Sequence, residues 1–168
     1  RRISFASDDG APVIRTEWDL YGLLGIDAGD TSRADLLVDG YLNRGLGLGI
    51  DANWRSSRAR GGILAYTIND QGRDSMTSGE TIDRDGETRS ILAAETIWRP
   101  DGPWTIFAEG SWISDPAFVD AFFEDLAETR RPFMSGVYAT RIDRSPNVDV
   151  NTALTAELRV TVNDFIVT

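Results

Sequence analysis

The sequence contains no cysteine and no histidine, and these two absences exclude several kinds of chemistry. Without cysteine there is no disulfide, no thiolate nucleophile and no zinc–sulfur site. Without histidine there is no Ser-His-Asp triad, no imidazole metal ligand and no side chain that ordinarily titrates near neutral pH. Basic residues are also few, 17 against 27 acidic, so the net charge is −10. A nucleic-acid partner requires a basic patch, so we expect none.

Long apolar runs are absent as well. No stretch approaches the roughly 18 consecutive apolar residues of a membrane-spanning helix, but barrel strands give a weaker signal and stay possible. The 168 residues suffice for one domain with a sizeable core. The chain begins at Arg1-Arg2 without an initiator methionine or an apolar signal segment, and it ends in a strand-like stretch, 164–168. We therefore expect a piece of a longer or processed protein.

From Ala34 onward the sequence has a period of two. In 46–55, apolar residues alternate with glycine and polar residues, and 153–162 repeats this alternation. Such alternation predicts strands with one apolar and one polar face. Their lengths of about 9–11 residues exceed the usual strand of a soluble protein and match a tilted membrane-spanning strand. The predicted strands are 34–43, 46–55, 61–69, 89–99, 104–113, 132–142 and 153–162.

The connections between these strands support the same prediction. Residues 56–60 and 100–103 are short, whereas 70–88 and 114–131 are long and polar. The connection 143–151 is intermediate, and the first one, near Arg44-Gly45, is short where a long one would fit. Short turns at one end and long loops at the other are typical of outer-membrane barrels. The predicted fold class is all-β, with antiparallel up-and-down strands of about 10 residues forming part of a transmembrane β-barrel. We expect 1–33 to be a lead-in segment before the barrel strands, and 34–168 to be a barrel segment of about seven strands from a larger barrel.

Tryptophans lie near the predicted strand ends, where aromatic girdles form at membrane interfaces. The alternative is that tryptophan simply favours strands. The candidate girdle residues are Trp54, Trp98, Trp104 and Trp112.

One connection is predicted to contain a short loop helix. Asp115 can cap a helix that has Pro116 at its first position. Val119, Phe122, Phe123 and Leu126 then follow at helical spacing. We expect this helix to pack against the rest of the fold, and a lid or partner-docking helix is the alternative.

Two motifs resemble ligand sites and fail the test of spacing. Residues 45–49 read GxGxG rather than GxGxxG, and a strand follows instead of a helix, so glycines that permit a close approach are the better interpretation. Residues 83–87 form an acidic turn that lacks the full calcium-loop pattern. No serine lies in a GxSxG context, and nothing selects a catalytic pair among the many carboxylates. We therefore expect no catalytic residues, no metal and no cofactor, and we do not expect an enzyme.

Several segments, in order, resemble a known family. They are 19–26 (DLYGLLGI), 41–45 (YLNRG), 112–118 (WISDPAF), 121–124 (AFFE), 153–155 (ALT) and 162–165 (VNDF). In this order and spacing the chain resembles the barrel region of LPS-assembly (LptD-like) proteins of the outer membrane, over roughly residues 18–168. It departs from them in lacking the periplasmic jelly-roll and the cysteines of some branches, and seven strands cannot close so large a barrel.

The resemblance implies a lipopolysaccharide transport component in the outer membrane. Lipopolysaccharide and outer-membrane lipid would be its partners, together with a plug lipoprotein and periplasmic bridge proteins of the transport system. An amphiphile needs a polar lumen for its sugars and an apolar route for its acyl chains. The candidate lumen-facing residues are Asp51, Asn53, Arg55, Glu109, Glu157 and Arg159, and the candidate lipid-facing residues are Leu48, Ile50, Leu158 and Val160.

Other functions stay open at this stage. A porin-like or structural outer-membrane barrel has the same strand pattern. A soluble acidic β-sandwich or carbohydrate-binding module would have shorter strands and a second sheet over one face. An outer-membrane barrel hydrolase is the least favoured because histidine is absent.

Overall fold

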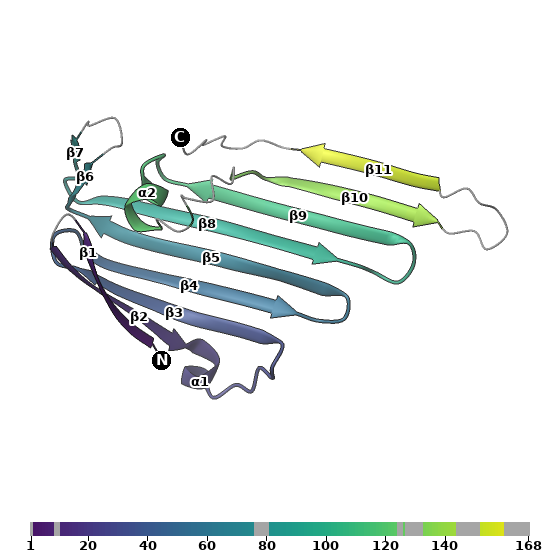
Figure 1. Ribbon diagram of the computed structural model, residues 1–168, viewed down its shortest axis with the longest axis horizontal. Helices are drawn as coiled ribbons and strands as arrows, with labels where there is room; N and C mark the ends of the chain where they lie inside the picture. The colour runs from purple at the N-terminus through teal and green to yellow at the C-terminus, as the bar shows by residue number, and fades with distance from the viewer. Residues whose placement is uncertain are drawn as a thin grey trace.

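A computed structural model describes residues 2–8, 11–75, 81–123, 126, 133–143 and 152–159, and its main feature is one nine-stranded antiparallel sheet. The strands follow one another across the sheet in chain order, interrupted only by a small hairpin between the fifth and the next (Figure 1). The sheet contains β1 (Arg2–Asp8), β2 (Ala11–Asp19), β3 (Ser32–Tyr41), β4 (Gly45–Arg55), β5 (Ala59–Asp70), β8 (Glu87–Trp98), β9 (Trp104–Ile113), β10 (Gly136–Asp143) and β11 (Thr152–Arg159). The hairpin pairs β6 (Arg73–Ser75) with β7 (Thr81–Asp83), and the helices are α1 (Leu20–Leu24) and α2 (Phe118–Phe122).

The predicted all-β class and antiparallel order are confirmed. The seven predicted strands correspond to β3, β4, β5, β8, β9, β10 and β11, although β10 begins at Gly136 rather than at residue 132. The sheet is open over the described residues, with β1 and β11 as its edges, and no closed barrel forms there.

The prediction that 1–33 is a lead-in segment before the strands is wrong. Strands β1 and β2 lie within it, and β2 pairs with β3 from Val13 opposite Tyr41 to Asp19 opposite Asp35. The sequence signal for β2 is weak because its alternation covers only 14–18, where Ile, Thr and Trp alternate with Arg and Glu, after Pro12 and Val13. Pairing with the strongly patterned β3 compensates for that weak local pattern.

The two ends of the sheet differ. At one end, called the turn end, short connections join β4 to β5 at 56–58 and β8 to β9 at 99–103, and the longer connection 20–31, which contains α1, joins β2 to β3. At the other, called the loop end, the long connections 71–86 and 114–135 leave the sheet. Both long connections therefore leave the same end, as the sequence predicts.

The two faces of the sheet differ as well. Register partners in neighbouring antiparallel strands project to the same face, so the pairing sorts the side chains. One face, called the apolar face, carries Ile14, Trp18, Leu36, Val38, Leu46, Leu48, Ile50, Trp54, Ile63, Leu92, Trp98, Ile106, Trp112 and Val137. The opposite face, called the polar face, carries Arg15, Glu17, Arg33, Asp35, Asp39, Asp51, Asn53, Arg55, Arg60, Glu95 and Glu109.

The buried core lies on the polar face, at the loop end. Phe118, Val119 and Phe122 of the α2 segment pack there against aromatic and aliphatic residues of the strands, and α2 lies over the sheet in Figure 1. The strand residues of this core are Val13, Tyr41, Tyr66, Ile68, Ile91 and Ile113. Complete burial of a phenylalanine or valine side chain stabilises a fold by about 1.5–3 kcal/mol. The apolar face has no such cover in the described part of the chain, and Leu48 and Leu92 are 45% and 49% exposed there.

The predicted loop helix is present but shorter and capped differently. It begins at Phe118 after Ala117, and no side chain caps it. The prediction that Asp115 caps the helix is wrong, because the Asp115 carboxylate instead accepts hydrogen bonds from Arg89 and Ser114.

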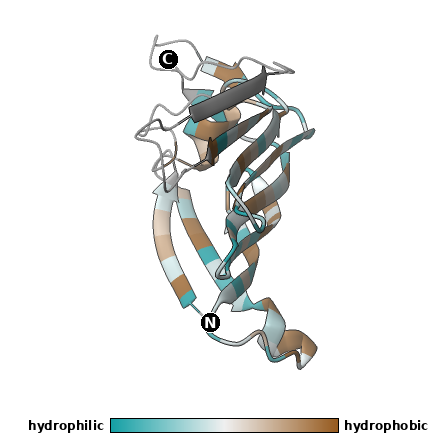
Figure 2. Cartoon of the chain, turned by 90° about the vertical axis from the view of Figure 1, so that its right-hand side faces the viewer, coloured by the Kyte–Doolittle hydropathy of each residue, from teal (hydrophilic) through white to brown (hydrophobic). Residues whose placement is uncertain are grey.

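The sheet is also curved. Figure 2 shows that the ribbon beginning at the N-terminus bends out of the plane of the other strands. Val13 of β2, on the polar face, is accordingly buried in the same core as Phe122. The polar face is therefore the concave face and the apolar face is the convex one.

Glycines in β4 make room for an aromatic ring on the polar face. Gly47 and Gly49 are the register partners of Ile68 and Tyr66, and the Tyr66 ring lies over both glycines. A Cβ at Gly47 would overlap the Tyr66 hydroxyl, and one at Gly49 would stand 2.6 Å from Tyr66 Cδ2. The Tyr66 hydroxyl donates to Asp39 Oδ2 at 3.0 Å, which fixes the ring. The interpretation of 45–49 as glycines of close approach is confirmed.

We expect Gly47→Ala to destabilise the protein by about 1–3 kcal/mol, because the new methyl group must displace the buried Tyr66 ring. Gly40→Ala is the matched control, since Gly40 lies in the adjacent strand β3 and a Cβ there would meet nothing within 4 Å. The measurement is the urea midpoint of the full chain in detergent. Equal midpoints for the two variants would contradict the packing described for Tyr66.

Candidate functional site

The most heavily charged part of the polar face is buried at the loop end. Three arginines and three aspartates meet there, and we call them the arginine–aspartate cluster: Arg44, Asp70, Asp74, Arg84, Arg89 and Asp115. They come from the β3–β4 connection, the end of β5, the β6 strand, the connection before β8, β8 itself and the segment after β9. The cluster therefore joins both long connections to the sheet.

Arg89 is the centre of the cluster and is only 1% exposed. Its Nε donates to Asp115 Oδ2 at 2.9 Å and its Nη2 donates to Asp115 Oδ1 at 2.7 Å, which makes a bidentate pair. Its Nη1 donates to Asp70 Oδ2 at 2.6 Å and to Asp74 Oδ1 at 3.1 Å. One guanidinium thus holds carboxylates from three separate segments.

The other two arginines complete the network around Asp74. Arg44 Nη1 donates to Asp70 Oδ2 at 3.0 Å and to Asp74 Oδ1 at 2.8 Å. Arg84 lies 2.8 Å from Asp74 Oδ2 and also pairs with Glu87 at 2.9 Å. Opposite charges are balanced within the cluster, so burial leaves no large uncompensated charge.

Aromatic rings cover the cluster from the α2 side. The guanidinium carbons of Arg44 and Arg89 each lie 5.3 Å from the centre of the Phe122 ring, and Arg89 lies 5.6 Å from that of Phe118. These cation–π contacts add to the ion pairs. The segment 114–122 is therefore anchored to the sheet both by Asp115 and by its aromatic residues.

The network lowers the pKa values of the two loop aspartates. Burial alone would raise the pKa of Asp74, but hydrogen bonds from Arg44, Arg84 and Arg89 more than offset it and leave that pKa below its usual range. Burial would likewise raise the pKa of Asp115, but its hydrogen bonds from Arg89 and Ser114 lower it overall.

We expect acid to release the α2 segment from the sheet. Because both folded-state pKa values are lowered, the stabilisation is fully present above the pKa of an unfolded aspartate, about 3.9, and is lost as the pH falls through the folded values. Protease cleavage within 115–123, measured between about pH 6 and about pH 2, tests this with an acid-active protease. In an Asp115→Asn variant the steep acid dependence should shrink, and an unchanged profile would contradict the assignment.

The cluster has the chemistry of an anchor rather than of a reaction centre. Every carboxylate in it is held by arginine, and the Ser114 hydroxyl donates to Asp115 at 2.9 Å. Sequence reasoning missed it because its contacts are remote in the chain: Arg44 lies 26 residues from Asp70 and 30 from Asp74. The only local signal is an arginine in the turn before Gly45.

The structure places the predicted lumen and lipid residues as follows. Asp51, Asn53, Arg55 and Glu109 all lie on the polar face, and Leu48 and Ile50 lie on the apolar face. The four candidate girdle tryptophans, Trp54, Trp98, Trp104 and Trp112, share the apolar face and lie within two residues of a strand end. Val160 and the side chains of Glu157, Leu158 and Arg159 lie outside the described residues.

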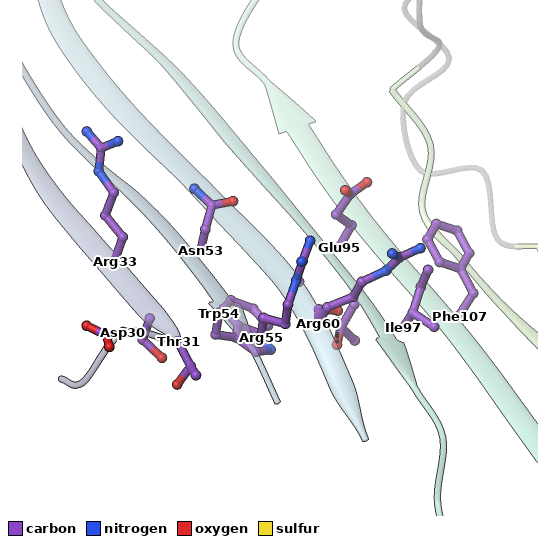
Figure 3. A pocket seen from close by; sticks show the side chains of 13 residues that line it. Asp30, Thr31, Arg33, Asn53, Trp54, Arg55, Arg60, Glu95, Ile97 and Phe107 are labelled. Atoms are coloured by element: carbon purple, nitrogen blue, oxygen red, sulfur yellow. Dashed lines mark hydrogen bonds between the residues drawn. The ribbon is translucent and has the colours of Figure 1, made fainter. Parts of the chain in front are cut away.

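Two cavities open on the polar face between the cluster and the turn end. One, of about 300 Å³, lies where Leu64, Ala93 and Glu109 of the sheet face Leu126, Phe133 and Met134 of the covering connection. The other, of about 470 Å³, lies at the turn end and is shown in Figure 3. Arg33, Asn53, Arg55, Arg60, Glu95 and Phe107 are among its lining residues. The described polar face is therefore hollowed between the cluster and the turn end.

The comparisons with protein families and with curated proteins give no guide to this site. No protein-family model matches the chain, and the search of curated proteins found no match. Within the described ranges, no group of three or more acidic residues is arranged to hold a metal ion, the acidic turn at 83–87 included. No helix in the described part of the chain is both long and apolar enough to cross a membrane.

Proposed function

We propose that this chain is part of the wall of an outer-membrane β-barrel that moves lipopolysaccharide to the outer leaflet. One observation carries the proposal: a single curved sheet with a concave polar face and a convex apolar face that none of the described residues covers. A barrel wall in a bilayer needs this division, because one face meets hydrocarbon and the other meets an aqueous lumen. The edges of the described sheet, β1 and β11, would then pair with further strands of a larger barrel.

The strand lengths support the same proposal. Strands β2, β3, β4, β5, β8 and β9 contain 9 to 12 residues, which fits a tilted strand that crosses a bilayer. Leu46 and Leu92, 58% and 49% exposed, belong to an apolar surface that spans most of the sheet. Water-soluble monomers rarely leave so large an apolar surface uncovered.

The proposed cargo depends on the polar face and on the resemblance to LPS-assembly proteins. The hollowed polar face offers carboxylates, guanidinium groups and an amide to a glycan, including Asp51, Asn53 and Glu109. The α2 segment, anchored by the arginine–aspartate cluster, would cover the lumen at the loop end. The plug lipoprotein and periplasmic bridge proteins remain proposed partners.

A porin-like barrel is the second candidate, because the division of faces serves it equally well. The soluble β-sandwich is less favoured. It requires a second sheet over the apolar face, and in the described residues the only other sheet is the hairpin β6–β7 of three residues per strand.

Spin labelling of the full chain tests the barrel wall directly. The chain has no cysteine, so Ile50→Cys and Asp51→Cys place labels on adjacent residues of opposite faces. In outer-membrane vesicles, the label at 50 should collide preferentially with oxygen and the label at 51 with a water-soluble nickel complex. Equal nickel access at both positions, together with no heat-induced shift on gels, would reject the barrel.

Photo-crosslinking separates lipopolysaccharide transport from a porin-like role. A crosslinker at Glu109 on the polar face should capture lipopolysaccharide in envelopes, whereas one at Asp101, in an exposed turn, should not. Capture at neither position in a protein that passes the spin-label test would favour the porin-like barrel.

A further inference from the structure

The turn-end cavity is lined by two arginines that face each other across neighbouring strands, beside the carboxylates of Asp30 and Glu95. Arg55 of β4 and Arg60 of β5 are direct register partners, and both are exposed on the polar face. Within the described ranges, neither side chain has an ion pair or a hydrogen bond. Like charges placed directly opposite across two strands destabilise a sheet. An anionic ligand between the two guanidinium groups would remove that repulsion.

Neighbouring arginines behave differently. Arg33, which lines the same cavity, is bonded to Asp35 and Glu17, and Arg58 in the adjoining turn pairs with Asp101 at 2.8 Å. The positive charge left for a ligand is therefore concentrated on Arg55 and Arg60. Guanidinium groups bind phosphate through paired N–H donors.

The rest of the cavity suits a sugar attached to that phosphate. Asn53 and Glu95 line it with an amide and a carboxylate, which accept hydrogen bonds from hydroxyl groups. Ile97 and Phe107 are register partners in β8 and β9 and supply an apolar wall. Figure 3 shows these side chains around one space at the ends of neighbouring strands. The cavity of about 470 Å³ has the size of a small-molecule site.

We propose that this cavity binds a phosphorylated saccharide. Arg55 and Arg60 donate hydrogen bonds to the phosphate, and Asn53 and Glu95 accept hydrogen bonds from the sugar hydroxyl groups. The same chemistry occurs in a free sugar phosphate and in the headgroup of a phosphorylated glycolipid. The inference that the ligand contains a phosphate and a sugar comes from the cavity geometry. The inference that this ligand is part of a lipid rests on the proposed function.

Binding to the full chain in detergent, measured by isothermal titration calorimetry, tests this. The probes are glucosamine 1-phosphate, a bis-phosphorylated glycolipid and the same glycolipid after dephosphorylation. Both phosphorylated probes should bind, and the dephosphorylated one should bind roughly tenfold to hundredfold more weakly, since hydrogen bonds to charged groups are lost. The double variant Arg55→Gln/Arg60→Gln should bind the phosphorylated probes more weakly by the same factor.

Arg58→Gln is the matched control, because Arg58 lies in the same turn but is paired with Asp101 outside the cavity. It should bind like the unchanged protein. The double variant should also keep or raise its thermal midpoint, since it removes a repulsion, so lost binding cannot be attributed to unfolding. Wild-type affinity in the double variant, or equal loss in Arg58→Gln, would overturn the site.

The two phosphorylated probes distinguish the source of the ligand. Tighter binding of the glycolipid than of glucosamine 1-phosphate supports a lipid headgroup, and equal binding of the two supports the site with a free sugar phosphate as its ligand. The latter result, combined with failure of the spin-label test, would reject the barrel and keep the site.

Discussion

Replacing Arg89 by alanine is expected to lower the free energy of unfolding by about 3–5 kcal/mol, the usual effect of breaking a buried ion pair. Arg89 is 1% exposed and donates to Asp70, Asp74 and Asp115. The variant would leave these three aspartates with two arginines, and it would also remove the guanidinium stacked on the Phe118 and Phe122 rings. Both effects release the segment that covers the loop end.

Equilibrium unfolding of the full chain in detergent measures the loss, and cleavage within 114–123 by added protease locates it. Arg58→Ala is the control, because the Arg58–Asp101 pair is exposed and such pairs contribute less than about 1 kcal/mol. If Arg89→Ala were as stable as Arg58→Ala, the cluster would not anchor the segment.

The sequence predicts the strands well because their signal is local. The alternation over 46–55 places Leu48 and Ile50 on one face and Asp51, Asn53 and Arg55 on the other without any tertiary information, and β4 has this arrangement. The same rule finds β3, β5, β8, β9, β10 and β11, because each is long enough for the period of two to stand out, and it misses β6 and β7, which have three residues each.

The arginine–aspartate cluster could not be predicted in this way. Arg89 and Asp115 lie 26 residues apart, and Asp115 has a local alternative as a helix cap that the sequence favours. Tertiary contact with a buried guanidinium prevails over that local role. Predicting the cluster requires knowing that both long connections leave the same end of the sheet, and then which charges on them meet.

The largest effect on the apolar face is expected from Ile50→Arg. Ile50 is 40% exposed near the middle of β4, a central strand of the sheet. If this face meets lipid, an arginine there should destabilise the protein in bilayers by about 2–4 kcal/mol, as arginine does at the midplane of a membrane barrel. If this face meets water, the same substitution should change stability by less than about 0.5 kcal/mol.

Asp51→Arg is the control because it puts the same side chain at the adjacent position on the opposite face. Asp51 is the register partner of Asp35, so an arginine there replaces two facing carboxylates by an attractive pair. We expect its stability to change by less than about 1 kcal/mol. Urea unfolding of both variants in vesicles therefore separates the effect of which face carries the arginine from the effect of introducing an arginine at all. A large loss for Ile50→Arg alone supports lipid contact, whereas small and equal changes would place the convex face in water and remove the basis for a barrel wall.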